Sequence, residues 1–323
     1  MLVGQGAATA AMSNGAPIMS VLKSTSSTLD PRGVRNVRRA VAELSPHVVH
    51  AVDRFAAGYA AAASCFGRQA ALLVGPARAS ECRRGAWRLL DPLIAQRADR
   101  LLVAAEKAPS GAAGQAAVPI GIQRLSSDPP FRTTLLQELA IPEDAKLIGV
   151  AGPLTPERRL KDAVWAADLL KCVRDDTHLL VLGEGPYRWR LQRYCRQVEI
   201  TDRVHFLGDR EDEPSVLASL DCYWETSSVD EVSIPLLEAM SAEIPVVAAD
   251  SPAARVLFPE DAGGLLVPPG DRATRARRTN TLLNDVGQRQ ARGVAGRLLV
   301  AQRFPIEKMV DAYRELYLAH SSH

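Results

Sequence analysis

The chain has 323 residues, of which 47% are hydrophobic and 24% are charged, and its formal net charge is +2. This length allows two α/β domains with buried cores, whereas the small net charge excludes the strongly basic field that would by itself indicate a nucleic acid partner. The five cysteines are scattered and have no C-x-x-C spacing, which favours a reduced, cytoplasmic setting over a disulfide framework. No stretch approaches the roughly eighteen uninterrupted apolar residues of a membrane span.

The first predicted helix is basic and amphipathic. A strand is expected over residues 16–22, and Asp30 with Pro31 then predicts a helix start, because aspartate caps a helix and proline suits its first turn. Two sets of residues lie on different sides of this helix, the apolar Val34, Val37, Val41 and Leu44 and the basic Arg35, Arg38 and Arg39. A basic face is usually solvated, and contact with an anionic lipid or an acceptor phosphate is the alternative.

The following elements complete a first α/β domain. A turn and a strand are expected over residues 45–53, an alanine-rich helix over 55–65 and a strand over 70–74. His47 and His50 are three positions apart on the first of these strands, so they point to opposite faces and do not form a two-histidine metal site. Further along, residues 126–130 are the most loop-like part of the chain, and we place a domain boundary there.

In the second half, predicted strands end in glycine-containing loops. A strand over 145–151 ends at Gly152, and a strand over 177–182 is followed by Gly183 and Gly185. Glycines between a strand and a helix let a ligand approach the backbone closely, although about half of such turns are plain connections. A further apolar strand is expected over 204–208. These loops are therefore candidates for ligand contact without being specific to it.

Two carboxylates flank the start of a predicted helix within residues 226–249. Ser233 is the expected N-cap, and Pro235 lies in the first turn, where a missing N–H costs nothing. The first amides of a helix have no partner within it and, together with the macrodipole, form a site for phosphate. Asp230 precedes this start and is placed to accept hydrogen bonds from sugar hydroxyls, and Glu238 is placed to hold a ribose. The alternative is an acidic loop before an ordinary amphipathic helix.

The run SSVDEVSIPLLEAMSAEIPVV resembles a signature of the retaining glycosyltransferases with the GT-B fold, the glycogen-synthase-like group known as glycosyl transferases group 1. That signature reads S-x-x-E-G-F-G-x-x-x-x-E-A-M-A-x-G-x-P-V-V. Segments similar to its other motifs occur in the family's order between residues 145 and 318, among them 152–158, 183–186, 204–208 and 263–271. Before residue 130 the resemblance is weaker, and the family's opening strand and glycine-rich loop are expected to be missing, through a misplaced start or a shortened domain.

The resemblance implies an α/β chain of GT-B architecture. Two Rossmann-like domains with parallel sheets would face each other across a cleft, with the N-terminal domain incomplete. The expected parts are a truncated acceptor-side domain over 1–128, a nucleotide-sugar-binding domain over 129–303 and a C-terminal crossover helix over 304–323. A nucleoside diphosphate sugar would bind at the carboxyl ends of the parallel strands.

The resemblance also implies roles for individual residues. Arg158 matches a cation that holds the donor diphosphate, Asp230 the acid that orients the sugar and Glu238 the acid that binds the ribose, so these three are the expected catalytic residues. Further donor-binding positions are Gly152, Gly183, Gly185, Phe206, Leu207, Ser233, Ile234, Pro235 and Leu236. His50 matches an acceptor-side histidine of the family, and a structural role for it is equally open. No metal, cofactor or side-chain nucleophile is expected, because protein groups would neutralise the leaving diphosphate.

Several positions depart from the family signature. Asp230 is shorter than the usual glutamate, Glu231 adds negative charge where phosphate would bind, and Pro153 stands where the family has a second cation. Glu243 brings a Cβ to what is usually a left-handed helix end, which costs about 1 kcal/mol if that geometry persists. These departures argue against full activity.

Two hypotheses of different class follow. The first is a retaining, hexosyltransferase-type enzyme of polysaccharide biosynthesis that transfers a sugar from a nucleoside diphosphate sugar to a glycan or lipid-linked acceptor. It would act in the cytoplasm, with peripheral contact to a membrane left open, and no nucleic acid partner is expected. The alternative is a non-catalytic relative that keeps the GT-B fold as a scaffold or partner-binding protein.

Overall fold

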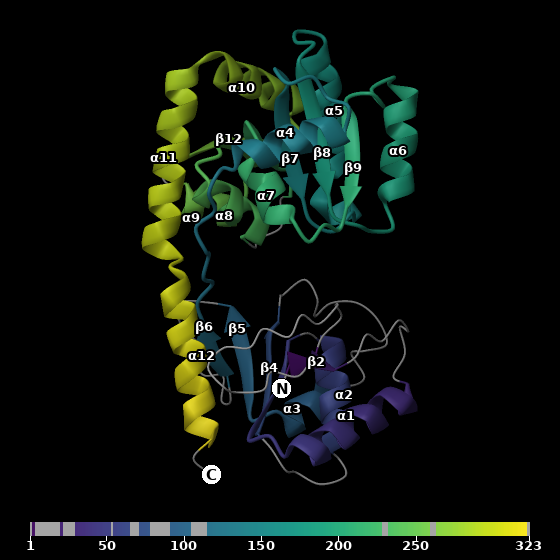
Figure 1. Cartoon of the computed structure of the whole chain (residues 1–323), viewed down its shortest axis with the longest axis vertical. Helices are drawn as coiled ribbons and strands as arrows, with labels where there is room; N and C mark the ends of the chain where they lie inside the picture. The colour runs from purple at the N-terminus through teal and green to yellow at the C-terminus, as the bar shows by residue number, and fades with distance from the viewer. Residues whose placement is uncertain are drawn as a thin grey trace. The chain divides into compact units, whose positions relative to one another are not determined.

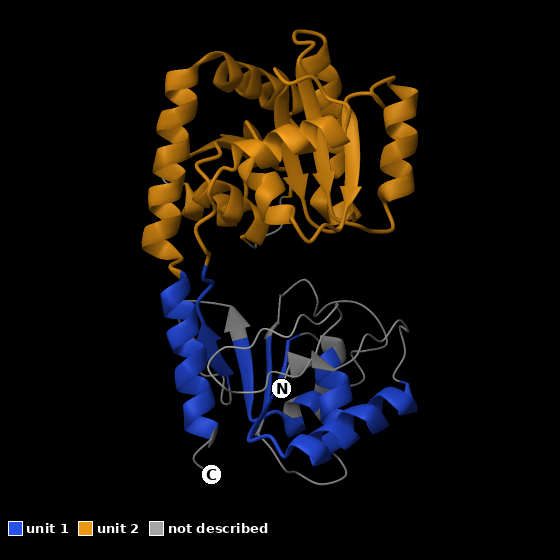
Figure 2. Cartoon of the chain, in the orientation of Figure 1, with its two compact units in different colours: residues 1–121, 306–323 blue, residues 122–305 orange. Residues whose placement is uncertain are grey.

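The computed structural model describes residues 2–3, 20–21, 30–52, 54–64, 71–77, 91–104, 115–227, 232–258 and 263–321. Two compact units divide the chain (Figure 2): the first consists of 1–121 with 306–323, and the second of 122–305. The boundaries expected from the sequence lie at 128 and 303. The helix at the end of the chain, α12 (Ile306–Ser321), is part of the first unit.

The first unit contains a parallel sheet with the strand order β2-β1-β3-β4-β5-β6 (Figure 1). Its described strands are β1 (Leu2–Val3), β2 (Ser20–Val21), β3 (Val48–Ala51), β4 (Ala71–Ala77), β5 (Arg100–Ala104) and β6 (Gln115–Val118). Its described helices, apart from α12, are α1 (Pro31–Leu44), α2 (Arg54–Ser64) and α3 (Asp91–Arg97). The alanine-rich helix α2 packs closely on β3 and β4, because its buried face presents small side chains.

Helix α1 begins as the sequence predicted. The side chain of Asp30 accepts a hydrogen bond from Arg32 N, and Pro31 occupies the first turn. Val37 is buried against Tyr59 of α2, and Val34 and Val41 pack on the same small cluster. The apolar face of α1 is therefore used within the first unit.

The second unit contains another parallel sheet, with the order β12-β11-β10-β7-β8-β9. Its strands are β7 (Lys146–Ala151), β8 (Thr177–Leu182), β9 (Val204–Gly208), β10 (Cys222–Glu225), β11 (Val246–Ala249) and β12 (Gly264–Val267). Its α-helices are α4 (Pro129–Glu138), α5 (Leu160–Lys171), α6 (Arg188–Gln197), α7 (Glu213–Ala218), α8 (Ile234–Ser241), α9 (Pro252–Leu257), α10 (Arg272–Asn284) and α11 (Val286–Arg303), and a 3-10 helix, η3, spans Pro156–Arg158.

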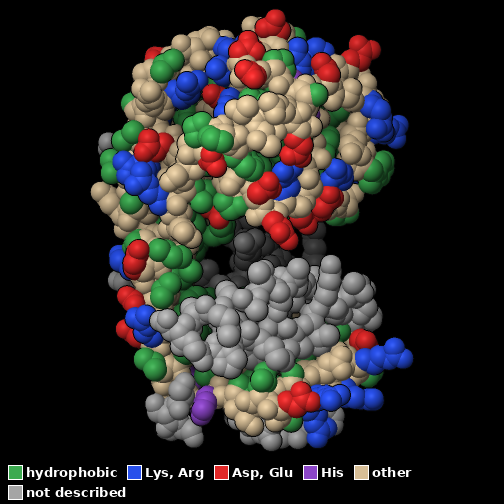
Figure 3. Space-filling model, viewed as in Figure 1, with side chains coloured by type: hydrophobic (Ala, Val, Ile, Leu, Met, Phe, Trp, Pro, Cys, Tyr) green, Lys and Arg blue, Asp and Glu red, His purple; other side chains and the backbone are tan. Residues whose placement is uncertain are grey.

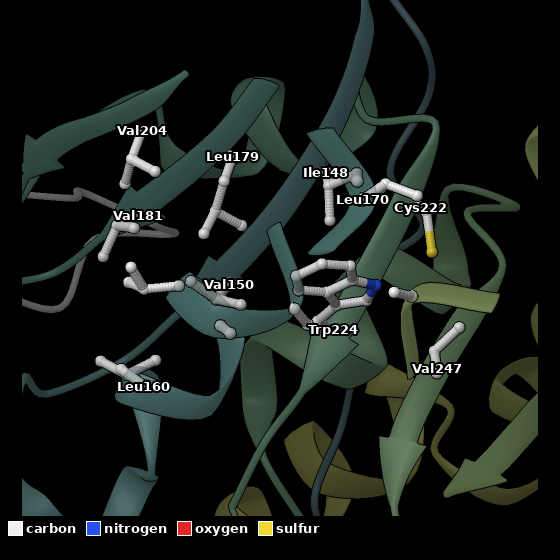
Figure 4. Packing of buried hydrophobic residues seen from close by; sticks show 14 of the residues in the cluster. Ile148, Val150, Leu160, Leu170, Leu179, Val181, Val204, Cys222, Trp224 and Val247 are labelled. Atoms are coloured by element: carbon white, nitrogen blue, oxygen red, sulfur yellow. The ribbon is translucent and has the colours of Figure 1, made fainter. Parts of the chain in front are cut away.

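Helices cover both faces of this second sheet. Helix α5 packs against α6, α10 and the sheet, and α8 packs against α7, α11 and the sheet. Covered strands must be apolar on both sides, and every residue of β8 and β10 is buried. Trp224 lies in the middle of the core, with Val150 and Val247 nearby (Figure 4), and its indole N–H donates to Thr279 Oγ1 at 2.8 Å.

The strand order reverses direction between β7 and β10. From β7 the chain proceeds outward through β8 and β9, then returns to place β10 on the other side of β7. In open parallel sheets, ligands bind outside the carboxyl ends of the strands at this reversal. A ligand-binding site is thus expected at the loops after β7 and β10.

Helix α8 ends in the left-handed geometry that is usual at this position of the signature, although the residue here is a glutamate. Glu243 has a φ of 65°, and its N–H donates to Met240 O at 3.0 Å. Its carboxylate lies 2.7 Å from Arg297 Nε of α11, an ion pair that offsets part of the backbone strain. This ion pair joins the end of α8 to α11.

Candidate functional site

Glycines allow the loops that follow β7 and β8 to pack closely against each other. Gly152 and Gly183 both have positive φ, at 122° and 104°. A Cβ at Gly183 would overlap the carbonyl group of Gly152, approaching its carbon to 2.9 Å, and a Cβ at Gly185 would meet Leu154 N at 2.7 Å. Close packing between loops therefore explains these glycines, which is the plain alternative that the sequence left open.

Arg158 joins the end of β7 to the beginning of α8. Its guanidinium folds back over Gly152, where Nη2 donates to Ala151 O at 2.7 Å and to Ser233 Oγ at 3.3 Å. The carboxylate of Glu225 lies 3.7 Å from the same nitrogen. Nη1 and Nε of Arg158 donate to no residue in the described part of the chain. Two N–H faces of a fixed cation are thus available at the switch point.

The first turn of α8 lies beside this cation. Ser233 is the N-cap residue, as predicted, but its hydroxyl makes no capping bond and instead accepts from Arg158. Pro235 has no N–H, so the first-turn amides are those of Ile234 and Leu236, which precede the first bond within the helix, from Leu237 N to Ser233 O. Amides and a guanidinium in one place suit an anion.

Glu238 projects from α8 near another carboxylate. It is half-buried, burial raises its pKa, and Glu213 of α7 raises the pKa further. The pKa of Glu213 is itself raised, mainly by burial. Sequence reasoning did not find Glu213, because nothing in the pattern indicates that α7 packs against α8. Asp230 and Glu231 lie outside the described residues.

The strand positions Phe206 and Leu207 are half-buried on β9. Arg188 Nη2 donates to Phe206 O at 3.0 Å, so this carbonyl already has a partner within the unit. Gly183 N donates to Gly208 O at 2.8 Å. The carboxyl end of β9 therefore lies next to the loop after β8.

His50 is buried in the first unit with both ring nitrogens engaged. Nε2 lies 2.5 Å from Gly75 O and Nδ1 lies 2.8 Å from Tyr317 Oη. Because a carbonyl only accepts, Nε2 carries the proton and Nδ1 accepts from the tyrosine. Burial lowers the pKa of His50. This arrangement ties α12 to β3 and β4 and supports the structural role that the sequence left open.

Glu225 is a site residue that sequence reasoning missed. It is the last residue of β10 and only 8% exposed. Its one signal in the sequence is an acid directly after the apolar run Cys222–Trp224.

In the described residues, no cluster of histidine, cysteine and acidic side chains is arranged to hold a metal ion. Of the described helices, none is long and apolar enough to cross a bilayer.

Solved structures place this arrangement of two parallel sheets in the GT-B class. An Anabaena protein, Alr3699/HepE, determined with UDP and glucose, aligns with a TM-score of 0.70 and 21% identity, over 90% of this chain and 81% of its own. Sucrose-phosphate synthase from Thermosynechococcus elongatus aligns with a TM-score of 0.67 and 19% identity, over 90% of this chain and 78% of its own. The chain thus has the α/β GT-B fold.

The family follows from the second unit. The family model for glycosyl transferases group 1 matches residues 131–298, and the chain belongs to this family. N-acetyl-alpha-D-glucosaminyl L-malate synthase of Bacillus anthracis is 28% identical, over 57% of this chain and 48% of its own length. The lipopolysaccharide core biosynthesis glycosyltransferase LpsE of Rhizobium meliloti is 26% identical, over 55% and 52%. The chain spans about half the length of these curated relatives.

Proposed function

We propose that the chain is a retaining glycosyltransferase that takes a sugar from a nucleoside diphosphate sugar. The observation that supports this most directly is Arg158, held against the first turn of α8 at the topological switch point with two N–H faces open. Family membership and relatives of the same fold that bind UDP and UDP-glucose support it further. The donor would lie at the carboxyl ends of β7 and β10.

In this proposal the leaving diphosphate is neutralised without a metal ion. Arg158 and the amides of Ile234 and Leu236 bind its oxygens, and these interactions strengthen as the glycosidic bond breaks and charge develops. The acceptor hydroxyl attacks the anomeric carbon on the face from which the diphosphate leaves, and a phosphate oxygen takes the hydroxyl proton. Glu238 holds the ribose, and Asp230 orients the sugar. No side-chain nucleophile takes part.

The remaining donor contacts are assigned by position. Gly152, Gly183 and Gly185 let the loops after β7 and β8 pack closely, which would hold the backbone of these loops beside the donor. Phe206 with Leu207 lies at the carboxyl end of β9, where the base would bind. His50 has no free nitrogen in its present arrangement, so an acceptor role would require Tyr317 to move away. We therefore expect the acceptor to be bound by other residues of the first unit.

The acceptor in this proposal is a lipid-linked saccharide or a glycan at a membrane surface. Basic side chains gather over α1 (Figure 3), where Arg32, Arg35, Arg38 and Arg39 are all exposed. Because the apolar side of α1 is buried within the unit, contact with lipid would be electrostatic rather than inserted. The relative named for lipopolysaccharide core biosynthesis is consistent with such an acceptor.

Nucleotide binding tests the proposal. We expect UDP, GDP or ADP to stabilise the protein against heat and to bind measurably by calorimetry. Arg158→Met should weaken the binding about 10- to 100-fold, the loss expected for charge-assisted hydrogen bonds to phosphate. The matched control is Arg203→Met, since Arg203 lies at the amino end of the edge strand β9, whereas the candidate site lies at the carboxyl ends of the central strands β7 and β10. If no nucleotide or nucleotide sugar stabilises the wild-type protein, the enzyme proposal is wrong and the non-catalytic alternative stands.

A further inference from the structure

Glu225 is a buried acid at a strand position where a covered parallel sheet normally has an apolar residue. It ends β10, and the three preceding residues of this strand, Cys222–Trp224, are at most 1% exposed. A covered parallel strand is built from apolar residues, and taking a carboxylate out of water is unfavourable unless it is paired. The charge of Glu225 must therefore interact with something nearby.

The two oxygens of Glu225 have different surroundings. Oε1 accepts a hydrogen bond from Ser227 N at 3.0 Å. Oε2 is buried, has no hydrogen-bond donor in the described part of the chain, and lies 3.7 Å from Arg158 Nη2. This distance is too long for a hydrogen bond but short enough for a strong electrostatic interaction. The free oxygen thus acts on Arg158 through its charge.

Glu225 also acts on a second arginine, in the core. Arg275 is 3% exposed, and burial lowers its pKa to about 10, while the charge of Glu225 opposes that change. Arg275 Nη1 donates to Val247 O at 2.7 Å. The carboxylate therefore stabilises one cation that belongs to the fold and one that faces the candidate donor site.

Arg158 does not depend on Glu225 for its position. Its Nη2 is held by Ala151 O and Ser233 Oγ, and its own carbonyl accepts from Thr226 Oγ1 at 2.6 Å. Removing the charge of Glu225 would leave these bonds in place. It would change the electrostatic potential around Arg158 rather than its geometry.

We propose that Glu225, through its charge beside Arg158, sets how strongly the donor site holds diphosphate. By offsetting part of the charge of Arg158, it weakens binding of the anion and allows the diphosphate to leave after transfer. The proposal rests on the function given above. It concerns a different quantity, the release of the product rather than the existence of the site.

Glu225→Gln tests this, because glutamine keeps the shape of the side chain and an acceptor for Ser227 N. We expect UDP, used as the probe, to bind about tenfold tighter and to dissociate correspondingly more slowly, since one unit charge is removed from the neighbourhood of the phosphate. A residue with only a structural role would weaken binding when replaced. In an Arg158→Met background the gain in UDP affinity from Glu225→Gln should be smaller, because only the direct repulsion between the carboxylate and the phosphate is then removed.

A second measurement determines how each substitution changes the free energy of unfolding, so that an effect on folding is not mistaken for an effect on binding. Urea unfolding of the wild type, Glu225→Gln, Arg158→Met and the double variant gives the coupling between the two side chains without any ligand. We expect the two losses of stability to be less than additive, because each substitution removes the same ion pair. Additive losses, or UDP that binds Glu225→Gln no more tightly than the wild type, overturn the inference. If the wild type binds no nucleotide at all, the proposed function fails first and the inference with it.

Discussion

Gly293 of α11 tests how closely α11 must approach α8. A Cβ added at this position would overlap the carbonyl oxygen of Glu243 and approach its carbonyl carbon to 2.9 Å. Both atoms belong to the backbone at the left-handed end of α8, so no side chain can turn away. Gly293→Ala can be accommodated only if one helix moves. Gly287, near the start of the same helix, provides the control, because its nearest neighbour is Asp285 Oδ1 at 3.5 Å.

The expected magnitudes follow from two opposing terms. Replacing a helical glycine by alanine raises stability by up to about 1 kcal/mol, less in the first turn. Overpacking a close contact costs about 1–3 kcal/mol, and contact with unyielding backbone belongs at the upper end. We therefore expect Gly293→Ala to lose about 2 kcal/mol of unfolding free energy and Gly287→Ala to gain about 0.5 kcal/mol.

Urea unfolding followed by circular dichroism measures both variants, with the denaturant slopes checked for equality. Because α8 supplies the candidate anion site, Gly293→Ala should also weaken nucleotide binding, whereas Gly287→Ala should not. If Gly293→Ala is as stable as Gly287→Ala, the two helices are not packed as described and the reasoning is wrong.

Two further predictions concern pH and lipid. Burial, aided by His205 and Arg203, lowers the pKa of His178 from 6.5 to about 4. The unfolded chain therefore binds protons more readily between these pH values. The free energy of unfolding should fall as the pH decreases through this window, by about 3 kcal/mol for this group. In urea titrations at several pH values, His178→Asn should show a smaller fall. On α1, the double variant Arg35→Gln with Arg38→Gln should weaken binding to phosphatidylglycerol vesicles, measured by sedimentation, by about 1 kcal/mol per arginine.

Matched controls separate these effects from general damage. His47→Asn, which replaces an exposed histidine, is the control for the loss of an imidazole. Arg190→Gln with Arg193→Gln removes the same charge from the exposed side of α6 and should leave vesicle binding intact. A pH slope as steep in His178→Asn as in the wild type, or a wild-type protein that sediments equally with phosphatidylcholine, contradicts the corresponding prediction.

The elements of the second unit were predictable where apolar runs are bounded by strong signals. The strands over 177–182 and 204–208 have the bounds expected from the sequence, because each is a largely apolar run followed by glycine or a charged residue. Ser233 was also identified correctly as the residue before α8. Local patterns of this kind depend on neighbours in the chain, which the sequence states directly.

The contacts of individual side chains were harder to predict from the sequence. Ser233 was expected to cap its own helix, but its hydroxyl accepts from an arginine 75 positions away. Gly183 and Gly185 suggested room for a ligand, yet they are explained by the neighbouring loop. The importance of Glu225 depends on β7 and β10 being adjacent, and this pairing of distant strands is set by the order of the sheet. Such contacts follow from topology, which no local pattern contains.

The charge balance around Arg158 changes how the departures from the family signature should be weighed. Pro153 supplies no second cation, and Glu225 offsets part of the one that remains. A diphosphate bound here would rely more on the amides of Ile234 and Leu236, which are dipoles whose strength no side-chain substitution removes. A site of that kind holds its anion less tightly, but it keeps the geometry that transfer requires. Weak diphosphate binding would thus be compatible with an active enzyme, and only its complete absence would favour the scaffold.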